Sequence, residues 1–436
     1  MLVGDANQRG VVQLLKTYRL VVLGATGVTG QNTFRHLAEH LPADFSWAIA
    51  GRNPDKMKKL VSDFPDRNST PAYIPADIVD RDSVDALIKN CDVLIHLAGP
   101  YATHGELFFE KCIEHRTHYV DIGGETFFIK RMIEKYHQAA SEKKVILLPT
   151  AGYESVPFDL LTLLAITHLE GAYQEHCEKI KIVTSFHRLG GVRDNRISGG
   201  SIGTMRNILA GDDCNAFNDM ACLLPPKADN GRVRDRNKIR YAARYDEDVQ
   251  AFTGPLQPAP FLNVPVVLRS AHLLSQAGID YGANFSYSDS MTMEFYADSP
   301  EGQQRAAKRS ARINRITSIA LAGPRPLRGL IRRRLDSLGV EPGDGPSQES
   351  LPFVDYTLRL FGESDRGRSI RAQARAKGHP GYLSTSKIVA EVGLFLAEEN
   401  TRPPVSFGVV TPATALGLEF LPRLERAGVK MEMCDY

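Results

Sequence analysis

The sequence predicts a doubly wound α/β fold, with a parallel sheet and a second α+β domain. In the first third of the chain, short apolar runs rich in β-branched residues alternate with helical patterns. A glycine-rich turn follows the first of these runs, at the place where a parallel strand would end and a helix would begin. The length of 436 residues exceeds what one core normally accommodates, which favours two domains.

Six apolar runs are predicted as parallel strands, because each is short and leads through a turn into a helical pattern. They are residues 19–23, 47–50, 72–77, 91–97, 119–122 and 145–148. The helices between them include one that Ser83 caps and two at about 106–115 and 127–141. Repeated strand–helix units of this length indicate that the strands lie parallel in one sheet.

The composition excludes several classes of protein. An apolar fraction of 43% excludes disordered chains, collagen and coiled coils. The 53 Lys and Arg nearly balance the 51 Asp and Glu, which argues against a nucleic-acid-binding protein. Six scattered cysteines without a C-x-x-C pair give no zinc signature and favour a reducing compartment. We predict a cytoplasmic protein, because residues 1–19 lack a signal-peptide core and the uncharged run 249–268 contains four prolines.

The motif that carries chemistry is the glycine-rich turn after the first strand. Its first glycine permits a tight turn, the second lets the backbone approach a pyrophosphate, and the third lets the helix pack on the sheet. The start of the helix offers free N–H groups and a positive dipole end to phosphates. Because the turn follows a strand and opens a helix, it predicts dinucleotide binding. The candidate residues are Gly24, Ala25, Thr26, Gly27, Val28, Thr29 and Gly30.

The end of the second strand indicates which dinucleotide is bound. NAD-selective sites place a carboxylate there to accept hydrogen bonds from the ribose hydroxyls. This chain has Arg52 and Asn53, with Lys56 one turn later. A guanidinium matches a 2′-phosphate, so we predict NADP(H) as the preferred cofactor, with NAD(H) as the alternative. Arg52 also has a simpler interpretation, as an exposed charge at the edge of the sheet.

Two further strand ends face the crevice in which ligands of such sheets bind. Asp77 contacts the adenine side of the cofactor or is a solvated turn residue. Ala98, Gly99 and Pro100 end the fourth strand, where the backbone is expected to pass the nicotinamide ribose. Tyr101 comes next and either points into the reaction space or has a structural role.

Several segments resemble the saccharopine dehydrogenase-like oxidoreductases, a family that includes trans-acting enoyl reductases. The resemblance spans nearly the whole chain and implies a nicotinamide-dependent oxidoreductase, but not saccharopine as the substrate. The similar segments are residues 24–30, 50–53, 98–101 with Gly105, 119–125, 151–159, 342–346, 381–387 and 410–417.

The resemblance also implies a domain order. Residues 17–164, completed by 384–436, would form the dinucleotide-binding domain, and 165–383 would form an inserted α+β substrate domain. Strands of the inserted domain are predicted at 180–186, 291–296 and 356–361. The cleft between the two domains is the expected active site.

The candidate catalytic residues are Tyr101, Tyr153 and Glu154, each just past a strand end. Each of them has the alternative role of closing a turn. No tyrosine lies four residues before a lysine, which excludes the usual acid of short-chain dehydrogenases. His96 is interpreted as a core residue. His115 and His118 lack a third ligand, so no metal is predicted.

Other features leave alternatives open. Ser201 is either a substrate or phosphate contact or part of a flexible turn. Residues 232–244 contain six basic residues and one acid, and 305–334 contain ten basic residues and no acid. The segment 305–334 is either a peripheral contact with an anionic membrane, a docking surface for an acidic carrier, or a solvated face whose acidic neighbours the fold supplies.

The leading functional hypothesis is an NADPH-dependent reductase of a C=C or C=N bond. A small-molecule or carrier-bound acyl substrate is predicted from the family and from the apolar stretch 261–274. The alternative is a non-catalytic nucleotide-binding scaffold at a membrane or lipid surface. A third hypothesis, an amino-acid-derived substrate, requires carboxylate-binding arginines in the cleft.

Overall fold

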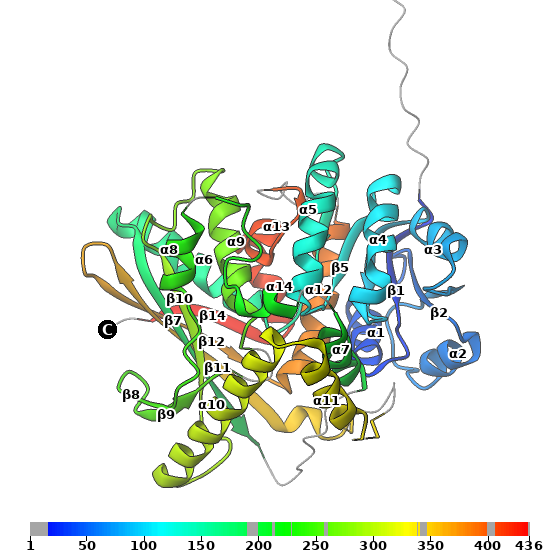
Figure 1. Ribbon diagram of the computed structural model, residues 1–436. Coiled ribbons are helices and arrows are strands. Elements are labelled where there is room, and N and C mark those ends of the chain that lie inside the picture. Colours follow the sequence, from blue (N-terminus) through cyan, green and yellow to red (C-terminus); the bar gives the residue numbers. More distant parts are fainter. Residues whose placement is uncertain are drawn as a thin grey trace, which may run out of the picture.

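The computed structural model describes residues 16–189, 199–211, 214–227, 229–256, 260–337, 339–340, 347–398 and 406–434. Two sheets lie side by side, each flanked by helices (Figure 1). The family-like segment 342–346 and the side chain of Ser201 lie outside the described part of the chain.

The first sheet is parallel throughout, with the strand order β13-β6-β5-β4-β1-β2-β3. Its strands are β1 (Tyr18–Leu23), β2 (Trp47–Gly51), β3 (Ala72–Pro75), β4 (Cys91–His96), β5 (His118–Asp121), β6 (Ile146–Leu148) and β13 (Gly408–Val409). The chain reverses its direction of travel through the sheet between β1 and β4. Ligands of doubly wound sheets bind at such a switch point, beyond the carboxyl ends of the strands.

Helices cover both faces of this sheet, which explains why its strands are apolar runs without alternation. Leu20 and Val22 of β1 belong to one buried cluster, and Val21 and Leu23 belong to another. The helices in this part of the chain are α1 (Val28–His40), α2 (Pro54–Ser62), α3 (Arg81–Ile88), α4 (Tyr101–His115) and α5 (Thr126–Glu142). The predicted doubly wound fold is therefore present.

The second sheet has the order β14-β12-β11-β7-β10-β9-β8, and its pairs are antiparallel except for β7 with β10. Its strands are β7 (Cys177–Arg188), β8 (Arg244–Asp246), β9 (Ala251–Gly254), β10 (Ser286–Thr292), β11 (Val354–Ser364), β12 (Ser369–Ala376) and β14 (Val429–Cys434). Its helices include α7 (Gly199–Ala210), α8 (Asn230–Arg236), α9 (Asn263–Ser275), α10 (Pro300–Ala322) and α11 (Arg325–Asp336).

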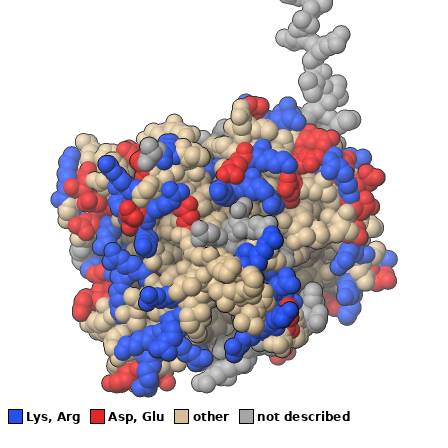
Figure 2. Space-filling model, in the orientation of Figure 1, with Lys and Arg blue, Asp and Glu red and all other residues tan. Residues whose placement is uncertain are grey.

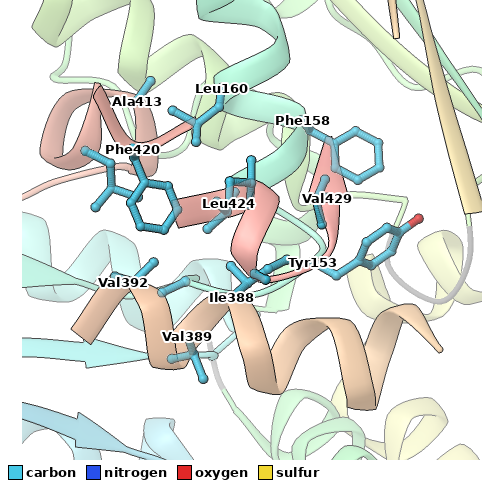
Figure 3. Packing of buried hydrophobic residues seen from close by; sticks show 14 of the residues in the cluster. Tyr153, Phe158, Leu160, Ile388, Val389, Val392, Ala413, Phe420, Leu424 and Val429 are labelled. Atoms are coloured by element: carbon cyan, nitrogen blue, oxygen red, sulfur yellow. The ribbon is translucent and has the colours of Figure 1, made fainter. Parts of the chain in front are cut away.

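The helices α6 (Val156–Tyr173), α12 (Thr385–Ala397), α13 (Pro412–Leu416) and α14 (Leu421–Arg426) join the two sheets. Figure 3 shows their side chains meeting in one apolar core, with Leu160 of α6, Val392 of α12 and Leu424 of α14 among them. The segment 384–436 divides between the sheets, because β13 pairs with β6 while β14 pairs with β12. The sequence analysis assigned residues 384–436 to the first domain. In the structure, α12 and β13 pack with the first sheet, whereas β14 belongs to the second sheet.

A buried carboxylate fixes α12 against α1. The Glu391 side chain is fully buried and accepts hydrogen bonds from His36 at 2.6 Å and from the Nε of Arg426 at 2.7 Å. Arg423 donates to its second oxygen at 3.1 Å. Burial opposes the charged form, but His36 and Arg426 outweigh it and lower the pKa of Glu391 to about 2, so the carboxylate is charged at neutral pH.

Three predicted boundaries were wrong. The helix predicted at 106–115 starts at Tyr101, because Pro100 is its N-cap and the following residues can continue the helix. The strand predicted at 291–296 corresponds to β10, which ends at Thr292. Its residues from Ser286 to Met291, which are mostly polar, pair with β7. The strand predicted at 72–77 ends at Pro75, before the turn that contains Asp77. No helix in the described part of the chain is long and apolar enough to span a bilayer.

Candidate functional site

The glycine-rich turn between β1 and α1 has the geometry that the sequence predicts. Gly24 has φ +88°, and a Cβ on it would lie 2.9 Å from the Leu97 carbonyl carbon. A Cβ on Gly30 would lie 2.2 Å from the carbonyl oxygen of Gly24. Gly27 is the N-cap of α1, and no side chain caps that helix. The turn therefore presents backbone N–H groups at a helix start, the arrangement that binds phosphates.

The basic residues after β2 lie beside this turn, because β2 pairs with β1. Arg52 and Lys56 are exposed. Asn53 has a local role as the N-cap of α2, since its Oδ1 accepts the Lys56 N–H at 3.0 Å. Binding of a phosphate on the adenosine side of a dinucleotide by these two cations remains a prediction.

Asp77 also closes a local turn. Its Oδ1 accepts the Val79 N–H at 3.2 Å, and its own N–H donates to Ser83 Oγ at 3.0 Å. The side chain is half-buried at the carboxyl end of β3. These hydrogen bonds show that Asp77 stabilises a turn. Its contact with the adenine side of the cofactor remains a prediction.

The end of β4 is where the backbone is expected to pass the nicotinamide ribose. Gly99 is exposed, Ala98 and Pro100 are half-buried, and the Gly99–Pro100 peptide is cis. His96 is fully buried below them, where its Nδ1 contacts the Tyr119 hydroxyl at 3.0 Å and its Nε2 contacts the Ala98 carbonyl at 3.1 Å. Burial lowers the pKa of His96 to about 3, so the ring is a neutral core group.

Tyr101 has its side chain packed against the end of β4. Its hydroxyl donates to the carbonyl oxygen of His96 at 3.2 Å, and its ring packs edge-on against the His96 ring. The residue is 6% exposed, and burial raises its pKa well above the usual value. Of the two alternatives for Tyr101, this packing describes the structural one, and a role in the reaction remains a prediction.

Two carboxyl groups at the end of β5 complete the site, and the sequence reasoning proposed neither of them. Asp121 accepts from the Tyr119 hydroxyl and the Gly123 N–H, both at 2.7 Å. Glu125 is 1% exposed, and its Oε1 accepts the Ala102 N–H at 3.5 Å. The signal available was the Gly123-Gly124 pair after a strand, which lets the backbone bring Glu125 next to the end of β4.

The electrostatic environment of this pair favours the protonated form of Glu125. Burial, followed by the negative charge of Asp121, raises the pKa of Glu125 to about 7. Burial raises the pKa of Asp121 to about 6, which its hydrogen-bond donors partly offset. A carboxyl group with a pKa near 7 can hold and release a proton at physiological pH, as a general acid must.

The second domain contacts the dinucleotide domain at this point. A Cβ on Gly124 would meet Leu262, which is the N-cap of α9, at 3.6 Å. In the second domain, Leu262 is buried and Phe261 is partly buried. In the first domain, Ile122 is half-buried and lies three residues before Glu125 in the sequence. The carboxyl pair therefore lies where apolar residues of both domains come together.

Tyr153 and Glu154 follow β6, the next strand of the sheet. The Tyr153 ring packs edge-on against Tyr356 at 4.7 Å, and its hydroxyl points away from the labelled core residues in Figure 3. Within the described residues, this buried hydroxyl has no hydrogen-bond partner. Burial raises its pKa well above the usual value, so the phenol stays protonated. Tyr153 remains a candidate proton donor. Glu154, half-buried beside it, remains a prediction.

One group of possible metal ligands lies away from this site. Asp85, Glu114 and His115 come together between α3 and α4. The Lys111 ammonium is 2.7 Å from both carboxylates and already supplies a cation there. His118 is elsewhere and accepts the Ile146 N–H at 3.0 Å.

Comparison with known proteins shows what the first domain is similar to. Residues 20–148 match the family model described as the saccharopine dehydrogenase NADP binding domain. This segment contains the glycine turn, Arg52, the end of β4 and Glu125. The first domain of the chain is thus similar to the NADP-binding domain of saccharopine dehydrogenases, and the chain is an NAD(P)-dependent oxidoreductase. The predicted resemblance to this family and the prediction of NADP(H) as the cofactor are thereby confirmed.

Relatives match this saccharopine dehydrogenase-like chain over nearly its whole length. Proteins named trans-acting enoyl reductase from Mycobacterium tuberculosis and Mycobacterium ulcerans are 27% and 28% identical, over 95% of this chain and 97% of their own. Among solved structures, apo saccharopine dehydrogenase (L-Glu forming) from Saccharomyces cerevisiae has a TM-score of 0.51 at 12% identity. The superposition covers 95% of this chain and 99% of the yeast chain, so this similarity shows a shared fold.

Proposed function

We propose that this oxidoreductase is an NADPH-dependent reductase of a C=C bond in a hydrophobic acyl substrate, free or bound to a carrier. The observation that carries the proposal is Glu125, a buried carboxyl group with a pKa of about 7 on the nicotinamide side of the switch point. The names of the mycobacterial relatives support enoyl reduction as the reaction.

The cofactor-binding residues divide into three groups on this proposal. The N–H groups at the start of α1, beside Gly27, bind the pyrophosphate. Arg52 and Lys56 bind the 2′-phosphate of the adenosine ribose. Ala98, Gly99 and Pro100 form the surface along which the nicotinamide ribose lies. These contacts hold the nicotinamide beside Glu125 and the residues of the second domain.

Reduction of an enoyl group needs one hydride and one proton. NADPH, when bound, would supply the hydride for the β-carbon of the enoyl group. The proton that completes the α-carbon comes from a group of the protein. Glu125 can supply it, because its pKa keeps a protonated fraction available at neutral pH. Tyr153 is the alternative donor, since its buried hydroxyl is protonated.

The surroundings of Glu125 favour an apolar acceptor. Leu262 and Phe261 at the start of α9 belong to an apolar cluster, and Ile122 is half-buried two residues before Gly124. Apolar walls exclude water and favour hydrocarbon substituents of the substrate. This environment suits an acyl chain better than an amino-acid-derived substrate, which would need cationic partners for its carboxylates.

The test is turnover of NADPH with defined acceptors. The panel contains trans-2-enoyl thioesters of increasing chain length, the matching saturated thioesters as controls, a cyclic imine and saccharopine with NADP⁺. Oxidation of NADPH with the enoyl thioesters alone, and a product heavier by two hydrogens, is the expected result. Preferential turnover of the imine would move the assignment to a C=N bond. Tight NADPH binding without oxidation across the panel would favour the non-catalytic scaffold.

A further inference from the structure

The surface of α10 and α11 has an unusual concentration of exposed apolar side chains. Of the twelve large hydrophobic residues that are exposed in the described part of the chain, five lie on these two helices. Their exposed fractions are 53%, 58% and 60% for Ile313, Ile316 and Ile319, and 40% and 65% for Leu327 and Leu330. Single exposed apolar residues are common, but a group of this kind marks an interaction surface.

The helix α10 packs on the second domain with its small residues and turns its isoleucines outward. Ala307 and Ala311 are buried, and α10 contacts β9. Ile316 follows Ala307 by nine residues, which places it on the opposite side of an α-helix. Ile313 and Ile319 flank it at spacings of three residues, so the three side chains form one outward stripe.

Arginines share that outward side. Arg309 and Arg312 lie four residues before Ile313 and Ile316, respectively, which puts each arginine one turn from an isoleucine. Neither arginine, nor Lys308 next to them, forms a salt bridge within the described residues. No acidic residue occurs between Glu301 and Asp336. The positive charge of this surface is therefore not neutralised from within α10 and α11.

The helix α11 is anchored from its inner side and extends the same surface. Arg328 is buried and donates to the Gly211 carbonyl oxygen, and Asp336 forms a salt bridge of 2.8 Å with Arg206 of α7. Leu330 and Arg334, one turn apart, are exposed. Figure 2 shows basic side chains over α10 and α11, with uncharged surface between them.

The other basic segment of the chain, 232–244, is different. Arg234 makes a bidentate contact with Asp219, at 2.7 and 2.9 Å. Arg236 donates to Asn284 and to the Ala283 carbonyl. In that segment the fold thus supplies a carboxylate for Arg234 and neutral partners for Arg236. Arg309 and Arg312 of α10 differ from Arg234 in having no salt bridge within the described residues.

We propose that the outer surface of α10 and α11 binds an anionic lipid bilayer. Aliphatic side chains that project from a helix can enter the acyl boundary, while arginines beside them contact lipid phosphates and keep their stems in the apolar layer. The surface suits a bilayer better than an acidic protein for two reasons. It has no acidic residue that could pair with basic residues of a protein and so fix the orientation of that protein. Its five exposed apolar residues also include no aromatic side chain of the kind that anchors protein partners. The proposal does not depend on the reductase activity.

The effect of each group can be stated as a change in binding. A basic residue near an anionic bilayer strengthens binding about fivefold, so removing the charges of Arg309 and Arg312 together lowers it about 25-fold. Replacing Ile316 and Leu330 with Asp removes two inserted side chains and adds two repelled charges, so we expect a loss at least as large.

The experiment measures binding of the full chain to sedimenting vesicles of phosphatidylcholine, with and without 30% phosphatidylserine, over a range of salt concentrations. The variants are Arg309→Gln with Arg312→Gln, and Ile316→Asp with Leu330→Asp. The matched controls are Lys89→Gln with Lys430→Gln and Val79→Asp, all at exposed positions on other surfaces. NADPH affinity and melting temperature establish that each variant is folded.

The expected result is binding that needs phosphatidylserine, falls with added salt, and is lost in both surface variants but not in the controls. Vesicle binding that the two surface variants leave unchanged would overturn the proposal. So would failure of the unaltered chain to bind vesicles while it binds immobilised polyglutamate, because that outcome assigns the surface to an acidic protein. All of these outcomes can be read without any turnover of substrate.

Discussion

The close contact at Gly30 gives the sharpest test of the cofactor site, through Gly30→Ala. The added methyl would lie 2.2 Å from the Gly24 carbonyl oxygen and 2.7 Å from the Ala25 Cα, where ordinary contacts begin at 3.4 Å. Both neighbours are backbone atoms of the phosphate-binding turn, so no side-chain rotation relieves the contact. The turn must move by about 1 Å, which exceeds the tolerance of a charge-assisted hydrogen bond.

The magnitude follows from the bonds that this shift breaks. Loss of two hydrogen bonds to a charged phosphate costs about 3 kcal/mol, which weakens NADPH binding roughly 150-fold. Overpacking also lowers the free energy of unfolding by about 1–3 kcal/mol. Calorimetric titration with NADPH and denaturant unfolding measure the two effects separately.

The matched control is Gly171→Ala, also within a helix. A Cβ on Gly171 meets no atom within 4 Å, so this change should leave NADPH binding unaltered and slightly stabilise α6. If Gly30→Ala bound NADPH within twofold of the unaltered chain, the reasoning that places the pyrophosphate against this turn would be refuted.

Three further results are expected. Arg52→Ala should weaken NADPH binding about 10- to 100-fold and leave NADH binding unchanged, because only NADPH carries the 2′-phosphate; equal losses in both titrations would contradict that role. Reductase activity should fall as pH rises through about 7, as Glu125 loses its proton, and Glu125→Gln should remove this dependence and lower kcat with little change in NADPH affinity. Glu391→Gln should cost about 3 kcal/mol of unfolding free energy, since it leaves two arginines without their buried carboxylate. The pKa of Glu391 is depressed from 4.5 to about 2, so its contribution is complete above pH 4.5 and is lost as pH falls toward 2, which urea unfolding at several pH values measures.

Much of the first domain could be predicted, because its signals are local. A parallel strand that is covered on both faces appears in the sequence as an apolar run. A position with positive φ, or without room for a Cβ, appears as a glycine. The turn at residues 24–30, the arginine after β2 and the loop after β4 were therefore recognisable before any tertiary contact was known.

The catalytic side was harder to predict, since it depends on what surrounds each group. Tyr101 looked available for catalysis, yet its phenol is held by the His96 carbonyl oxygen. Glu125 was not proposed from the sequence, yet it is 1% exposed beside the end of β4, and burial followed by the charge of Asp121 raises its pKa to about 7. Its burial depends on the packing of the turn after β5 against α4, which no local motif shows.

The parallel sheet and the glycine-rich turn could be predicted from the amino-acid sequence, because strand burial and backbone conformation are encoded residue by residue. The sequence also contained the full positive charge of 305–334. The packed structure was needed to show which side of α10 and α11 faces the solvent, that β14 joins the second sheet, and that Glu125 is buried. Those outcomes depend on contacts between distant segments, and desolvation acts only after the segments have packed together.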